Sequence, residues 1–209
     1  MLSVRGLVGV FQDLGLEGAL TDLFAPLLAI LLAWPQSLTP EGLPLETQAA
    51  REERYETIAG ASTQAARDGK GWTLPVRVAG IITVWQTDNN LDPFIHAGVP
   101  HPDPRRHEDH GKARCLGSVH RNDWFTFEQW RALAGTSYSA TLRCARATLR
   151  LLRSQWWICG KDRGDLETQL AWTLQQYATG AKECAEPCQE SKDRARFWVE
   201  LANQLGGAK

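Results

Sequence analysis

A run of apolar residues at 72–87 constrains the fold of this chain more than any other feature. Valine and isoleucine dominate the run, so a β-strand is the competing interpretation, but its length favours a helix. Pro75 lies near the first turn, where the N–H that proline lacks would have no helical partner. Because apolar side chains occupy more than one face, we predict a buried central helix.

The apolar run ends in a polar segment that carries the carboxylate of Asp88. A loop rich in proline and histidine follows at 98–114, and the chain then returns through Gly-Lys-Ala-Arg-Cys-Leu-Gly, which begins at Gly111. A carboxyl group at the end of a buried helix could protonate a glycosidic oxygen if it faced a groove. The alternative is a helix C-terminus that is capped by aspartate and asparagine side chains.

The composition fits a soluble globular protein with a substantial core, because 43% of the 209 residues are hydrophobic and 22% are charged. This length suits one large domain, or one domain with an extension. The net charge of −1 provides no overall field that would favour nucleic acid or an anionic membrane. The nine tryptophans favour core packing, although one or two could also line a sugar-binding groove.

Residues 1–45 differ from the rest of the chain, and we separate them from a domain at 46–209. The twelve apolar residues at 23–34 are too few for a comfortable membrane span but suit the apolar core of an export signal. Acidic residues precede them and only Arg5 is basic, which is a poor start for such a signal. Three alternatives stay open: a buried or partner-docking helix, a degraded export signal, and a membrane-associating segment. A proline-rich linker follows at 35–44.

Four sequence segments after this linker occur in an order that resembles the lytic transglycosylases and goose-type lysozymes. TDNNLDPFIHAG, which begins at Thr87, resembles the Glu-Ser-x-Phe/Leu-Asp-Pro segment of that family, and GKARCLGSVH resembles its Gly-x-x-Leu-Gly-Gln turn. Residues 130–152 are similar to the helix that follows, and 174–184 to a later Tyr-x-x-Gly segment. The resemblance covers about residues 46–205. It implies a mainly α, lysozyme-like domain with at most a small β element.

The resemblance also implies a chemistry, namely cleavage of the bond between N-acetylmuramic acid and N-acetylglucosamine in peptidoglycan. In that family one carboxyl group protonates the leaving oxygen and then deprotonates the 6-hydroxyl of the sugar, which closes a 1,6-anhydro ring without water. Aligned on Asp92-Pro93, Asp88 takes the place of the family's catalytic glutamate. Asp92 is the alternative acid, although an Asp-Pro pair more naturally starts a turn. No cofactor, metal or nucleic acid is implied.

The other predicted site residues would contact the glycan or the acid. Tyr177 matches the family's Tyr-x-x-Gly position, and Ser118 stands where the family has glutamine. His96 and His120 would flank the same groove. Trp85 and its apolar neighbours would raise the pKa of Asp88 by desolvation, and the nearby helix C-terminus would act in the same direction.

Aspartate in place of glutamate puts the chemistry of the site in question. Its carboxyl would lie roughly 1–1.5 Å further from a substrate placed for glutamate, and a misplacement of about 1 Å can cost on the order of a hundredfold in rate. Two functions are therefore weighed. One is a peptidoglycan-cleaving enzyme of the bacterial periplasm, cell envelope or a phage particle. The other is a weakened or inactive module that binds glycan or serves a structural role in the same places.

The five cysteines favour an oxidising compartment, because they are spread through the domain and lack metal-ligand spacing. We predict at least one intrachain disulfide after export, with the connectivity open and one thiol left over. A bridge could pin the loop at Cys184-x3-Cys188, which has no second pair that would complete a zinc site. Three histidines and two aspartates in the 98–114 loop also match no ligand template, so we interpret that loop as solvated.

The remaining pattern predicts further helices at 46–67, 127–133, 139–158, 165–178 and 191–205, with a short strand or turn after Cys115. The helix at 139–158 carries apolar residues on one face and four arginines on the other, at 143, 146, 150 and 153. We interpret this row of arginines as a solvated helix face rather than a polyanion site.

Overall fold

The computed structural model describes residues 21–36, 38, 44–98, 113–120, 125–180 and 183–206, and it is mainly helical, as predicted. Residues 99–112 of the predicted solvated loop, with all of its histidines, lie outside the described residues. The elements in chain order are α2 (Thr21–Ala33), α3 (Gln48–Asp68), α4 (Leu74–Asn89), α5 (Pro93–Ala97), β1 (Ala113–Arg114), β2 (Val119–His120), α6 (Phe127–Arg131), α7 (Tyr138–Gln155), the π-helix η2 (Trp156–Gly160), α8 (Leu166–Thr179) and α9 (Gln189–Gln204).

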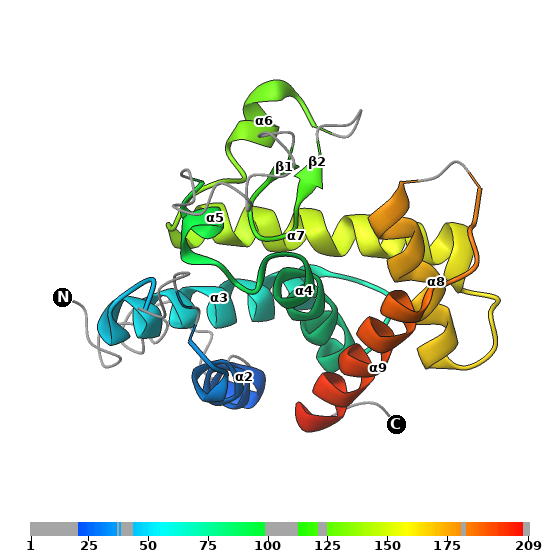
Figure 1. The fold of residues 1–209 in the computed structure, drawn as a ribbon, viewed down its shortest axis with the longest axis horizontal. Coiled ribbons are helices and arrows are strands. Elements are labelled where there is room, and N and C mark those ends of the chain that lie inside the picture. Colours follow the sequence, from blue (N-terminus) through cyan, green and yellow to red (C-terminus); the bar gives the residue numbers. More distant parts are fainter. Residues whose placement is uncertain are drawn as a thin grey trace.

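The predicted central helix is confirmed as α4, and no part of its apolar run forms a strand. Figure 1 shows α4 in the middle of the molecule, with α3 on one side, α9 on the other and α7 behind. Pro75 lies in its first turn, and the helix ends where Asn90 takes a left-handed conformation with φ of 51°. Its buried side chains are Val76, Val78, Ile81, Ile82, Val84 and Trp85. Burial around the whole helix explains why the run is apolar on more than one face.

The contact between α4 and α9 depends on a glycine and a tryptophan. The fully buried ring of Trp198 on α9 lies against Gly80, where an added Cβ would come within 2.2 Å of ring atom Cζ2. The indole Nε1 of Trp198 also donates a hydrogen bond of 2.6 Å to the carbonyl of Val76. The two helix backbones can approach this closely only because residue 80 has no side chain.

The apolar N-terminal run forms α2, a helix that packs against α3. Leu23, Leu27 and Leu31 repeat every four residues and are buried in the same hydrophobic core as α4. Trp34, just after the helix, packs its ring against Phe197 of α9 at 5.9 Å between centroids. The described part of this run is therefore a helix with one buried face, while Ala25 and Ala29 are exposed. The export signal and the membrane-associating segment stay predictions. Within the described residues, none of the helices combines the length and apolar character needed to cross a bilayer.

A buried arginine joins the segment just before α3 to the turn that follows α4. Arg54 of α3 is ion-paired with Glu46 and donates a hydrogen bond to the carbonyl of Leu91. Its guanidinium group also lies 4.6 Å from the ring centroid of Tyr55. A buried guanidinium is stable only with several partners of this kind, so Arg54 anchors both segments to α3.

The short β element predicted after Cys115 is a two-stranded antiparallel hairpin, in which Arg114 pairs with Val119. It lies with α6 above α4 and α7 in Figure 1. Two disulfides hold the outer segments: Cys115–Cys144 joins the hairpin to α7, and Cys159–Cys184 joins η2 to the segment before α9. The prediction of at least one intrachain disulfide is confirmed, and Cys184 bridges to η2 while Cys188 keeps a free thiol.

The α4–α9 contact predicts the effect of Gly80→Ala. Alanine favours a helix over glycine by about 1 kcal/mol, but its Cβ would overlap the ring of Trp198, and overpacking of a core costs about 1–3 kcal/mol or more. We expect a net fall in the free energy of unfolding, measured by chemical denaturation. Gly60→Ala in α3 is the control, because its Cβ would meet Tyr138 Cε2 at 3.2 Å and Phe24 Cε2 at 3.8 Å, without the overlap found at Gly80. Equal stability of the two variants would contradict the proposed role of this contact.

Candidate functional site

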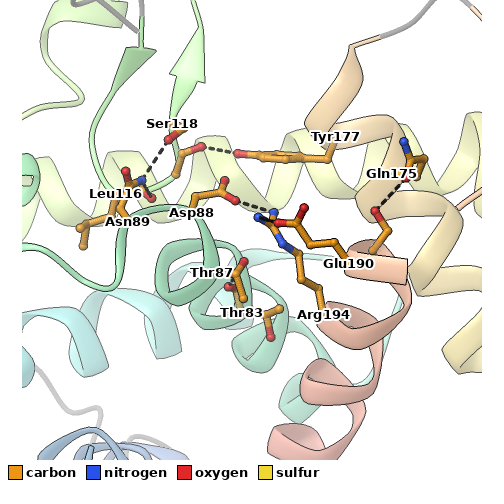
Figure 2. Close-up of polar contacts among 12 residues, drawn as sticks. Thr83, Thr87, Asp88, Asn89, Leu116, Ser118, Gln175, Tyr177, Glu190 and Arg194 are labelled. Carbon is orange, nitrogen blue, oxygen red and sulfur yellow. Dashed lines mark hydrogen bonds and ion pairs between the residues drawn. The ribbon is translucent and has the colours of Figure 1, made fainter. Parts of the chain in front are cut away.

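Asp88 lies in the last turn of α4 and is ion-paired with Arg194 of α9, which is also paired with Glu190. Its carboxylate Oδ1 is 2.7 Å from Nη1 of Arg194, and Nη2 of the same guanidinium is 2.6 Å from Oε1 of Glu190. Figure 2 shows the three side chains converging between the two helices. The side chain of Asp88 is 16% exposed and that of Arg194 is 18% exposed, whereas Glu190 is 71% exposed. The ion pair between Asp88 and Arg194 is therefore mostly shielded from water. The side chain of Glu190 lies on the side that faces solvent.

The pKa of the Asp88 carboxyl is raised above its usual value, and burial is the main cause. Arg194 opposes this rise through its charge and its hydrogen bond, while the charge of Glu190 adds to it. The predicted direction and the predicted desolvation are confirmed, whereas the contribution of the helix C-terminus stays a prediction. A carboxyl group that keeps its proton at higher pH than usual is better suited to act as a general acid.

The turn of the β-hairpin is bonded to the C-terminal end of α4. Asn89 Nδ2 donates to the carbonyl of Leu116 at 2.7 Å and to Ser118 Oγ at 2.9 Å. On the other side, the hydroxyl of Tyr177 on α8 donates to the carbonyl of Gly117. Figure 2 shows this turn next to Asp88, with Tyr177 reaching across from α8. Three elements that are distant in the sequence are thus joined at one point.

Gly117 is required by close packing below the turn. A Cβ at this position would come within 2.1 Å of Thr148 Oγ1 and 3.2 Å of Trp85 Nε1. The indole N–H of Trp85 donates to that same threonine hydroxyl at 3.1 Å. Trp85 is fully buried, so its ring lies beneath the turn and supports it from below. Close packing therefore explains why residue 117 is a glycine, without any contribution from a ligand.

Tyr177 is close enough to Asp88 for their charges to interact. Burial raises the pKa of its hydroxyl, and the negative charge of Asp88 raises it further. The phenol therefore stays protonated and acts as a hydrogen-bond donor at neutral pH. The structure thus brings together three predicted site residues, Asp88, Ser118 and Tyr177. Asn89 joins them, and the predicted Trp85 lies below.

His96, His120 and Asp92 have other surroundings. His96 on α5 is 2% exposed, and its Nε2 lies 2.8 Å from Thr141 Oγ1 of α7. His120 is exposed on β2. Asp92 is fully buried, and its carboxylate accepts hydrogen bonds from the N–H groups of Phe94 and Ile95. It therefore caps the N-terminus of α5, in line with the turn that an Asp-Pro pair predicts. Contact of either histidine with a glycan stays a prediction.

Sequence reasoning missed Arg194, Glu190 and Asn89. Glu190 and Arg194 are four residues apart on α9, a spacing that predicts an ion pair along the helix but not its meeting with Asp88, 106 residues away. Asn89 was assigned only to helix capping, whereas its side chain bonds the hairpin. These contacts depend on helix packing and carry no local signal.

Comparisons of this chain with protein-family models, with curated proteins and with solved structures find no match.

The ion pair predicts how the pKa of Asp88 responds to its neighbours. Arg194→Gln removes a nearby positive charge, so the carboxylate loses support and the pKa of Asp88 should rise further. Glu190→Gln removes the opposing negative charge, so that pKa should fall. Carbon-13 NMR titration of the Asp88 carboxyl measures both shifts without any need for a substrate. Arg196→Gln, an exposed position on the same helix, is the control. No shift in either variant would mean that the pair is absent in solution.

His96 predicts a pH dependence of stability. Burial, with a smaller effect of Arg54, lowers the pKa of His96 to about 4 from 6.5. Thr141 donates its hydroxyl proton to the carbonyl of Ser137, so it accepts from the Nε2–H of a neutral imidazole. A folded-state pKa below the unfolded value means that stability is present above about pH 6.5 and is lost as the pH falls toward 4. The loss is on the order of 3 kcal/mol.

His96→Gln tests this, because an amide Nε2 can still donate to Thr141 but does not titrate. Denaturation curves between pH 7 and 4 should show a smaller loss of stability in the variant than in the wild type. His120→Gln, on an exposed strand position, should leave the wild-type dependence unchanged. If His96→Gln keeps the full pH dependence, other groups cause it.

Proposed function

We propose that this protein cleaves peptidoglycan glycan strands in the manner of a lytic transglycosylase, with Asp88 as the single acid and base. The observation that carries the proposal is the state of this carboxyl: its pKa is raised by burial at the end of α4, next to a hairpin turn and Tyr177. The ordered resemblance of four segments to the lysozyme-like family supports the same function. The proposed fold assignment is accordingly lysozyme-like.

In the proposed reaction, protonated Asp88 gives its proton to the glycosidic oxygen as the bond between that oxygen and the anomeric carbon breaks. The resulting carboxylate then takes the proton of the sugar's own 6-hydroxyl. The 6-oxygen bonds to the anomeric carbon, which forms the 1,6-anhydro ring, and Asp88 ends the reaction protonated, as it began. No water is consumed, so a partly buried carboxyl suits both steps.

Arg194 has opposite effects on the two steps. Its charge favours the carboxylate, which helps the step in which Asp88 acts as a base. The same charge opposes protonation, which the first step needs. Burial and Glu190 act against Arg194, and the outcome is a raised pKa. The balance between these groups therefore sets the pH range in which the proposed reaction proceeds.

A bacterial envelope or phage particle is the proposed location, and peptidoglycan glycan strands are the proposed partner. The two disulfides support an oxidising compartment, since such bonds rarely persist where thiols are kept reduced. Ser118 and Tyr177 are the proposed glycan-side residues. Each already has a partner within the protein, so binding of a sugar would add to these bonds or replace them.

A second function, glycan binding without cleavage, is favoured by one specific observation. Arg194 is hydrogen-bonded to the same carboxyl that must carry the proton, at 2.7 Å. Together with the shorter aspartate side chain, this arrangement would suit a module that has lost its activity and has kept the fold. Asp88 would then be a structural residue that ties α4 to α9.

Substitution of Asp88 distinguishes the two functions. Purified cell walls are incubated with the protein, and mass spectrometry measures the release of anhydro-muropeptides. For an enzyme, Asp88→Asn should lower the rate by ~10²–10⁴-fold, because the amide keeps the shape and loses the transferable proton. Asp88→Glu should raise the rate, because the added methylene moves the carboxyl toward the substrate position of the family. Asp193→Asn, an exposed aspartate on α9, is the matched control.

Each other outcome has a defined meaning. A wild type without activity on any peptidoglycan, combined with activity in Asp88→Glu, would identify a binding module derived from an enzyme. Activity that is unchanged in Asp88→Asn would remove this residue from the mechanism. Circular dichroism melting of each variant separates loss of chemistry from loss of fold.

A further inference from the structure

We propose that the face formed by α7 and η2 docks on an anionic phospholipid surface. Residues 143–163 hold six of the chain's 23 basic residues and only one of its 24 acidic residues. This local excess lies within a chain whose net charge is −1. Positive charge therefore exceeds negative charge in this one region, although the net charge of the whole chain is close to zero. The proposal does not depend on the function of Asp88.

The basic residues lie in a single row. Arg143, Arg146, Arg150 and Arg153 are spaced by three or four residues, which places them on one face of α7. The π-helix η2 continues directly from α7, and Trp157 lies four residues beyond Arg153. At ~1.5 Å per residue the row is about 20 Å long, enough to contact several lipid headgroups.

The end of this row is apolar and unusually exposed. Trp157 is 51% exposed and Ile158 is 62% exposed, whereas the other tryptophans whose rings pack at this end, Trp72 and Trp156, are partly buried. The Nζ of Lys161 lies 4.5 Å above the ring centroid of Trp157. Tryptophan beside a lysine is typical of segments that lie in the headgroup layer, where the ring contacts acyl chains and the cation contacts phosphate.

Further positive charge lies next to the row. Arg153 is near enough to Arg77 of α4 that its charge, after burial, helps to lower the pKa of Arg77. Lys70 is exposed in the adjoining loop. Like charges placed together cost stability in the isolated protein, and an anion bound there would offset this cost.

Within the described part of the chain, Asp68 and Asp162 place negative charge at the two ends of this positive region. Asp68 is ion-paired with Arg146 at one end, and the 86% exposed Asp162 lies next to Lys161 at the other. Between these two ends the face consists of Arg150 and Arg153 followed by Trp157 and Ile158. Positive charge alone would fit any polyanion, but the exposed apolar pair favours a lipid surface, because it can enter the headgroup layer.

Vesicle sedimentation tests the proposal directly. We expect the protein to bind vesicles of phosphatidylglycerol and phosphatidylethanolamine and not vesicles of phosphatidylcholine, with binding weakened by added salt. Arg150→Gln with Arg153→Gln should lower the affinity by on the order of tenfold or more. Trp157→Ser with Ile158→Ser should lower it by a similar factor, because the apolar contact is lost.

The matched control removes two positive charges elsewhere. Lys192 and Arg196 are both exposed on α9, so Lys192→Gln with Arg196→Gln should leave vesicle binding unchanged. Circular dichroism melting checks that all variants are folded. Equal loss in the control, equal binding to phosphatidylcholine, or absence of binding to anionic vesicles at physiological salt would overturn the proposal. Binding of polyphosphate or DNA without binding of vesicles would also overturn it, because the face would then serve another anion.

Discussion

The close packing of α9 on α4 is the constraint on which the rest of the site depends. Trp198 lies over Gly80, and this contact sets how deeply and at what rotation the two helices meet. Arg194 lies one helical turn before Trp198 and Asp88 about two turns after Gly80, so packing in the core brings the two charges together. The ion pair is therefore a consequence of core geometry as well as of charge.

The hairpin turn is positioned from three helices, by a disulfide and by hydrogen bonds, in addition to its buried side chains Leu116 and Val119. The Cys115–Cys144 disulfide joins it to α7, Asn89 bonds it from α4, and Tyr177 bonds it from α8. Together these three contacts fix the turn against the end of α4. Polar groups held from several sides keep a defined geometry, which a catalytic or binding site requires.

Charge has two different roles in this molecule. In the interior, Arg54 and Arg194 each meet a carboxylate and join segments that are distant in the sequence. On the face of α7 and η2, positive charge lies in a row next to exposed apolar side chains. The row of arginines was interpreted from the sequence as a solvated face, and the structure adds Trp157, Ile158 and Lys161 beside it. This combination is what suggests a surface for an external anion.

The sequence by itself determined the helices, because periodicity, caps and breakers act within a few residues. The apolar run before Asp88 was predicted as a helix in this way, and Asp92-Pro93 as the start of a turn, whereas the short helix α5 that follows this turn was not predicted. It also predicted the raised pKa of Asp88 from apolar neighbours. Only the tertiary structure decided which cysteines pair and that Arg194 meets Asp88, because such contacts depend on the packing of whole helices and leave no local pattern.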